Sequence, residues 1–186
     1  MTGPSESHAA PIAVIGAASL FAAFLAAPAP ASPDGAEWET ADNAEGCLAC
    51  HLGAPVTTES EGLAIDGLPR KPMPGRAYAL SITLTDPALQ NAGFLLRIAA
   101  VTGSPGTLVA TDGKTETTGA LARSTFDGAT PAEPGTAHWQ LEWTAPEPIE
   151  GPLRFDLWAN AGNWDLSPLG DRLHRRSFEL DPPHTP

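Results

Sequence analysis

The stretch Trp139-Gln140-Leu141-Glu142-Trp143-Thr144-Ala145-Pro146 indicates the fold more clearly than any other part of the chain. Large apolar residues stand at every second position from Trp139 to Trp143, and polar residues fill the positions between them. This period of two is typical of a β-strand that has one face in a core and the other in water. The strand is expected to end at Ala145-Pro146, because proline cannot donate a hydrogen bond to a sheet ladder.

Similar alternation or short apolar runs, separated by turn signals, occur on both sides of this stretch. The other segments expected to form strands are 78–84, 94–98, 107–111, 115–124, 153–157 and 172–180. Asp86-Pro87 and Asp112-Gly113 are turn signals between them. Seven short strands without a helical period predict an all-β fold, an immunoglobulin-like antiparallel β-sandwich of about seven strands.

A different signal precedes the strands, where Cys47-Leu48-Ala49-Cys50-His51 reads C-x-x-C-H. This is the attachment pattern of c-type haem. Two thiols at this spacing can each form a thioether with one haem vinyl group, and His51 can then supply the proximal iron ligand. The chain has 2 cysteines, so no other cysteine competes for this role. We therefore expect one covalently bound haem c, attached through Cys47 and Cys50.

Two other interpretations of the cysteine pair are weaker. A thioredoxin-like redox pair requires a βαβ context, whereas these cysteines lie in a Gly- and Ala-rich acidic stretch. A zinc site with histidines would require an H-x3–5-H partner, which the sequence does not contain.

Residues 11–27 form an apolar run that is long for the core of a signal peptide and short for a membrane span. Ala29-Pro30-Ala31 offers a cleavage pattern, although the leader has no basic residue. We expect a periplasmic or otherwise extracytoplasmic protein that is exported, with possible membrane attachment through 11–27 if the segment is not cleaved. The expected organisation is a signal peptide or anchor at 1–31, a linker at 32–45, a haem-attachment segment at 46–73 and the β-sandwich at 74–181.

The chain is strongly acidic, with 10 Lys and Arg against 22 Asp and Glu and a formal net charge of -12. Such a chain is not expected to bind nucleic acid, because like charges repel. A redox partner protein is the expected partner.

The residues also resemble a known family, the bacterial reelin-like (Reeler, or choice-of-anchor type) β-sandwich domains that carry an N-terminal C-x-x-C-H motif. The resemblance covers about residues 44–180 and rests on these matches: the C-x-x-C-H motif, 74–78, 92–96, 139–146, 151–155 and Gly170-Asp171. It implies an exported sandwich with haem at one end. The family often has a histidine shortly before the first tryptophan of the W-x-x-x-W run, whereas residues 123–129 here contain none.

The sixth position of the iron has three candidate ligands. If the strands run up and down in order, the first, fifth and seventh begin at one pole, and the haem motif leads into the first. Met73, His138 and His174 would then lie near the haem. His174 is the first choice, because first and last strands are commonly neighbours in a sandwich; His138 is the second and Met73 the third.

These patterns predict an exported monohaem c-type cytochrome that transfers one electron at a time. The rival hypothesis is an extracytoplasmic binding, adhesion or ligand-sensing module in which the haem is structural or sensory. We do not expect an enzyme, because the sequence has no nucleophile motif and no Gly-rich phosphate loop.

Overall fold

The computed structural model describes residues 46–182 apart from 52–53, 132, 166 and 168. The leader and linker expected at 1–31 and 32–45 lie outside this part of the chain. Two one-turn 3-10 helices occur in it, η1 (Gly46–Ala49) and η2 (Asp127–Ala129). No helix among the described residues is long and apolar enough to cross a membrane.

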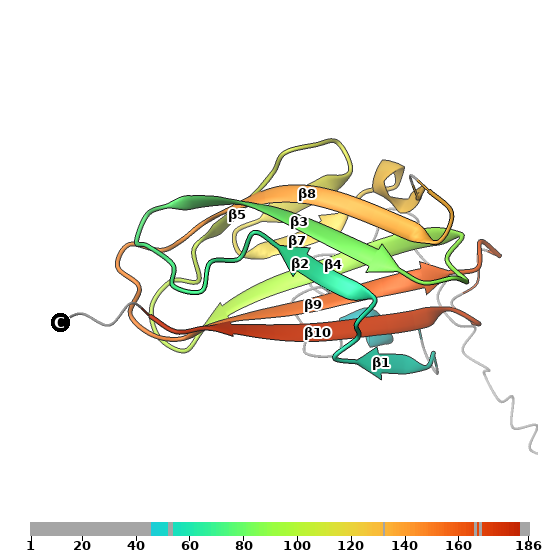
Figure 1. Ribbon diagram of the computed structural model, residues 1–186, viewed down its shortest axis with the longest axis horizontal. Helices are drawn as coiled ribbons and strands as arrows, with labels where there is room; N and C mark the ends of the chain where they lie inside the picture. The colour runs from blue at the N-terminus through green and yellow to red at the C-terminus, as the bar shows by residue number, and fades with distance from the viewer. Residues whose placement is uncertain (1–45, 52–53, 132, 166, 168, 183–186) are drawn as a thin grey trace, which may run out of the picture.

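The strands form two sheets that pack face to face (Figure 1). The six-stranded sheet has the order β1 (Val56–Thr58), β10 (Arg172–Leu180), β9 (Leu153–Gly162), β4 (Asn91–Ala100), β7 (Leu121–Ser124), β6 (Thr115–Thr118). The four-stranded sheet has the order β2 (Leu63–Asp66), β3 (Ala77–Thr85), β8 (Thr136–Thr144), β5 (Thr107–Ala110). The predicted antiparallel sandwich is confirmed, with one parallel pair, β1 and β10.

The core between the sheets is built from the alternating apolar residues. Trp139 and Trp143 on β8 are fully buried, as the period of two predicts. The ring of Trp143 packs edge to face against the ring of Phe155 of β9, with 5.0 Å between the ring centroids, and this contact joins the two sheets. Its indole nitrogen Nε1 donates a hydrogen bond to the carbonyl of Pro105 at 3.1 Å, so the buried polar atom is satisfied.

The first, fifth and seventh predicted strands, which correspond to β3, β8 and β10, were expected to begin at the same end of the sandwich. This expectation was wrong for β3. β3 and β8 are antiparallel neighbours, and Ala77 at the start of β3 pairs with Thr144 at the end of β8. In Figure 1, β3 begins at the left, whereas β8 and β10 begin at the right. Met73 precedes β3 and therefore lies at the end of the sandwich opposite to the start of β10.

A second, smaller apolar cluster lies on the outer face of the six-stranded sheet. Leu95 of β4 and Trp158 of β9 form it, and Cys47, Leu48 and Val56 pack against them. The pairing of Trp158 with Leu95 places the two side chains next to each other on neighbouring strands. This cluster docks the cysteine-containing segment onto the sheet, behind β9 and β10 in Figure 1.

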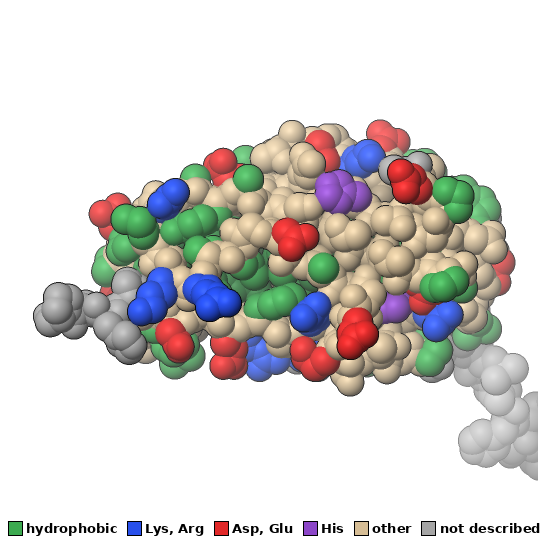
Figure 2. All heavy atoms as spheres, in the orientation of Figure 1, with side chains coloured by type: hydrophobic (Ala, Val, Ile, Leu, Met, Phe, Trp, Pro, Cys, Tyr) green, Lys and Arg blue, Asp and Glu red, His purple; other side chains and the backbone are tan. Residues whose placement is uncertain are grey.

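Charged side chains of both signs are interspersed on the face of the molecule shown in Figure 2. The net charge of -12 belongs to the whole chain and is not gathered into one acidic patch on this face.

Candidate functional site

The two cysteines and His51 lie on a single helical turn. The carbonyl of Cys47 accepts hydrogen bonds from the backbone N–H of Cys50 at 3.3 Å and of His51 at 3.0 Å. These two bonds bring the backbone of Cys50 and His51 close to that of Cys47, so the three residues of the motif lie together on one turn. Neither thiol forms a disulfide.

His51 lies against a buried carboxylate that sequence reasoning did not identify. Its ring atom Nδ1 is 2.7 Å from Oδ2 of Asp171, which is 4% exposed. Nδ1 makes no hydrogen bond of good geometry in this conformation, although the separation is within hydrogen-bonding range.

Asp171 is itself held in place from two directions. Asn160 at the end of β9 donates to its Oδ2 from Nδ2 at 3.2 Å, and the backbone N–H of Asn163 donates to Oδ1 at 3.3 Å. Gly170-Asp171 formed part of the family resemblance, but no local pattern linked this carboxylate to the haem motif.

The Cys47 thiol is not activated for redox exchange. Burial, and to a smaller extent the neighbouring Cys50, raises the pKa of this thiol to about 12, although the residue as a whole is only half-buried. A thiol with such a pKa is protonated at neutral pH and is a weak nucleophile. This property argues against a thioredoxin-like function of the pair.

A bare metal ion would also find few ligands. Among the described residues, no group of three or more His, Cys, Asp or Glu side chains is arranged to hold one.

His174, the first choice for the distal ligand, has both ring nitrogens engaged. Nδ1 is 2.8 Å from Oγ of Ser60, and Nε2 is 3.0 Å from Oδ2 of Asp86. Side chains alternate between the two faces of a strand. The neighbour of His174, Arg175, lies over the ring of Trp158 on the outer face. His174 therefore faces the interior, on the opposite side of the six-stranded sheet from the cysteine-containing turn.

Ser60, His174 and Asp86 form a hydrogen-bonded chain of the residue types found in a hydrolytic triad. All three are buried, with exposures of 3%, 5% and 2% respectively. Oγ of Ser60 also accepts a hydrogen bond from the backbone N–H of Gly62 at 3.2 Å. The chain of bonds closes the sandwich by joining the β1–β2 connection and the end of β3 to β10.

The other two distal candidates also lie away from His51. His138 is exposed on β8 in the four-stranded sheet, and its Nδ1 is 3.2 Å from Oγ1 of Thr83. Met73 is 56% exposed, and its sulfur accepts a hydrogen bond from Arg76 at 3.5 Å. The structure therefore brings together Cys47, Cys50 and His51, and it places the three candidate distal ligands elsewhere.

A charged network lies on β9 and β10 beside the apolar cluster. Burial alone would raise the pKa of the Asp156 carboxyl, but hydrogen bonds from Ser177 and Arg154 and the charges of Arg154 and Arg175 lower the pKa below its usual 3.8. The guanidinium of Arg175 thus contacts both Asp156, at 3.5 Å, and the face of Trp158.

Comparisons with known proteins support the fold. No protein-family model matches the chain, and no curated protein sequence matches it. Among solved structures, the human F-spondin reeler domain (fragment 1) is similar, with a TM-score of 0.50 and 14% identity, covering 69% of this chain and 94% of that one. The Reelin-N domain of F-spondin gives a TM-score of 0.53 and 14% identity, covering 74% and 96%. The fold is a reelin-like β-sandwich, and at this identity the likeness extends to the fold alone.

Proposed function

We propose that this chain is an exported c-type cytochrome module that transfers single electrons, built on a reelin-like β-sandwich. Cys47 and Cys50 would hold one haem c through thioethers, and Nε2 of His51 would bind its iron on the proximal side. The observation that supports the proposal is the placement of His51, on the same turn as both cysteines and with Nδ1 2.7 Å from the buried carboxylate of Asp171.

The residues present fit a haem group. A histidine that binds a metal almost always directs its other ring nitrogen to a carboxylate, a backbone carbonyl or water. Oδ2 of Asp171 lies 2.7 Å from Nδ1 of His51, within the distance of such a bond, and Nε2 would then be the nitrogen that remains for iron. Leu95 and Trp158 give the cysteine-containing turn an apolar support on the sheet. The haem, when bound, supplies the one-electron redox chemistry, whereas the protein binds and orients it.

The test of the proposal is covalent attachment. The full chain would be expressed with a cytochrome c maturation system, and the mature protein would be measured by denaturing mass spectrometry. We expect the added mass of one haem, and its loss in the double variant Cys47→Ala/Cys50→Ala. A wild-type protein that emerges with two unmodified thiols would refute the proposal.

A second function is favoured by the positions of the predicted distal ligands. In the described part of the chain, His174, His138 and Met73 all lie away from His51, so none of these three would be the second ligand of an iron held at His51. A haem with an open position binds small ligands such as carbon monoxide or nitric oxide, which suits a sensory module. The absorption spectrum separates the two functions: a six-coordinate low-spin haem with reversible cycling supports electron transfer, and a five-coordinate high-spin haem that binds carbon monoxide supports sensing.

The remaining parts of the proposal follow from the sequence. Export would rely on residues 11–27, which lie outside the described residues and could also attach the protein to a membrane. The redox partner would be a protein on the same side of that membrane.

A further inference from the structure

The buried position of Asp171 suggests more than a generic contact with His51. Its Oδ2 lies 2.7 Å from Nδ1 of His51, a buried atom that has no other hydrogen-bond partner and is not aligned for a hydrogen bond with Asp171 in this conformation. Asn160 and the backbone N–H of Asn163 donate hydrogen bonds to the two oxygens of Asp171. Asp171 directly precedes Arg172, the first residue of β10, so the sheet holds its backbone. The carboxylate is therefore fixed in place before any group binds to His51.

A fixed carboxylate has a defined effect on a neutral imidazole. An ionised carboxylate only accepts hydrogen bonds, so Nδ1 has to carry the proton for the pair to be favourable. The lone pair then resides on Nε2, the nitrogen left for iron. A carboxylate charge next to a haem ligand stabilises the ferric state of the iron, which carries one more positive charge, more than the ferrous state.

We infer that Asp171 is a positioning residue that holds His51 in the Nδ1–H tautomer and lowers the reduction potential of a haem bound at Nε2. The effect on the tautomer belongs to the protein alone, whereas the effect on the potential rests on the proposed function. A haem with a lowered reduction potential would donate its electron readily, so its partner would be an electron acceptor of higher reduction potential.

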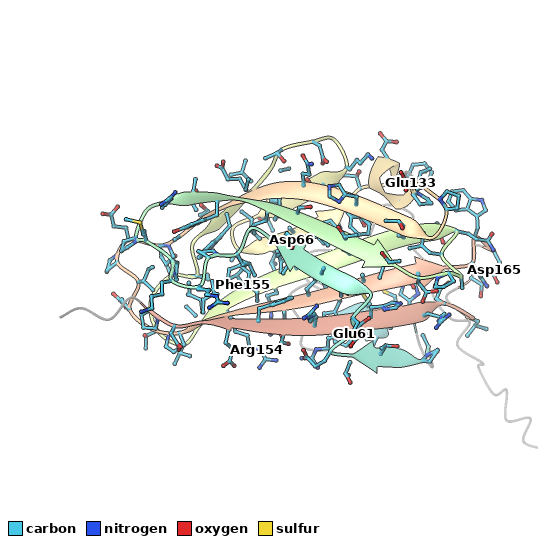
Figure 3. The ribbon with its side chains drawn as sticks, viewed as in Figure 1. Glu61, Asp66, Glu133, Arg154, Phe155 and Asp165 are labelled. Atoms are coloured by element: carbon cyan, nitrogen blue, oxygen red, sulfur yellow. The ribbon has the colours of Figure 1, made fainter. Side chains whose placement is uncertain are left out.

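The test compares Asp171→Asn with Asp165→Asn. Asp165, which is labelled in Figure 3, lies on the loop between β9 and β10, is exposed, and hydrogen bonds to the side chain of Asn163. Both substitutions remove one negative charge from the same loop, but only Asp171 contacts His51. The control therefore separates a specific effect from a general change in charge.

The first readout needs no haem. Nitrogen-15 NMR of the imidazole in the apoprotein, at a pH well above the ordinary histidine pKa, reports which ring nitrogen carries the proton. We expect the Nδ1–H form in the wild type and in Asp165→Asn, and a shift toward the Nε2–H form in Asp171→Asn. Equal tautomer populations in all three proteins would overturn the inference.

The second readout is the midpoint potential of the protein with haem attached, measured by spectroelectrochemistry. Loss of such a partner typically changes metal binding by about tenfold or more. A tenfold change in the ferric-to-ferrous preference corresponds to about 59 mV for a one-electron couple. We expect the potential to rise by at least this amount in Asp171→Asn and to change much less in Asp165→Asn.

The outcomes separate the two proposals. If haem attaches and both variants shift the potential equally, or neither does, the inferred role of Asp171 is refuted and the proposed function stands. If haem does not attach to the wild type, the proposed function and the effect on potential both fail, while the NMR measurement still decides the tautomer. Unfolding curves for both variants show whether the substituted proteins remain folded.

Discussion

His174→Ala is expected to destabilise the fold without changing the ligands of a bound iron. In the structure His174 bridges Ser60 and Asp86 in the interior of the sandwich. The distal-ligand hypothesis predicts the opposite pattern, in which the same substitution turns a low-spin haem into a high-spin one. The variant therefore distinguishes an internal bridge from an iron ligand.

The size of the effect can be estimated from the groups that lose a partner. A buried polar group that loses its hydrogen-bond partner costs about 1–3 kcal/mol. Ser60 and Asp86 would both lose a partner, although Asp86 keeps contacts with Arg172 at 3.2 Å and with the backbone N–H of Ala88 at 2.8 Å. We therefore expect a loss of about 3 kcal/mol in the free energy of unfolding.

Urea unfolding of the full chain, followed by tryptophan fluorescence, measures this loss. With a slope of about 1–3 kcal/mol/M, the midpoint should fall by roughly 1–3 M. The control is His138→Ala, which removes an exposed histidine and should change stability by no more than about 0.5 kcal/mol. If His174→Ala leaves the urea midpoint unchanged but converts a low-spin haem to a high-spin one, the bridging role is wrong and the distal role is right.

Three further predictions concern other parts of the molecule. Because the pKa of Asp156 is lowered in the folded protein, the contribution of this carboxylate to stability is present above about pH 4 and is lost as the pH falls through the folded pKa. Asp156→Asn should therefore make the unfolding free energy decline less steeply in acid, which urea unfolding at a series of pH values would measure. Gly67 has a φ of 92°, and a Cβ there would meet a backbone carbonyl of β3, so Gly67→Ala should lower the free energy of unfolding by about 1–3 kcal/mol or more. Gly113→Ala, whose new Cβ would have nothing within 4 Å, should lower it far less in the same urea assay. Because the pKa of its thiol is about 12, Cys47 in the native apoprotein should react with iodoacetamide at neutral pH much more slowly than in urea, as measured by peptide mass mapping. Equal rates of alkylation would contradict the burial of the thiol.

The fold could be predicted because its signal is local. Alternation from Trp139 to Trp143 depends only on which residues face the core, and both tryptophans are fully buried as expected. The Pro and Gly turn signals likewise depend on a few adjacent residues. The prediction of about seven strands omitted β1 and β2, which are 3 and 4 residues long and too short to show a clear period. It also took 115–124 as one strand, whereas this stretch is an antiparallel hairpin of β6 and β7.

The distal ligand could not be predicted in the same way, because the argument depended on how the strands are ordered in space. The up-and-down order placed Met73, His138 and His174 at one pole, whereas β3 runs opposite to β8. The face to which a residue points is equally sensitive, since a shift of one position along a strand reverses it. His174 and Arg175 are adjacent in sequence, yet one lies in the interior and the other over Trp158.

The segment from Asp171 to His174 links the candidate haem site to the interior of the fold. Asp171 contacts His51 on the outer side of the six-stranded sheet, and three positions later His174 contacts Asp86 on the inner side. Arg172, between them, also forms an ion pair with Asp86 at 3.2 Å.

A displacement of the start of β10 would therefore disturb both the carboxylate beside His51 and the buried bridge. A substitution that weakens the buried bridge should consequently also broaden the imidazole NMR signals of His51, even though His174 and His51 lie on opposite faces of the sheet.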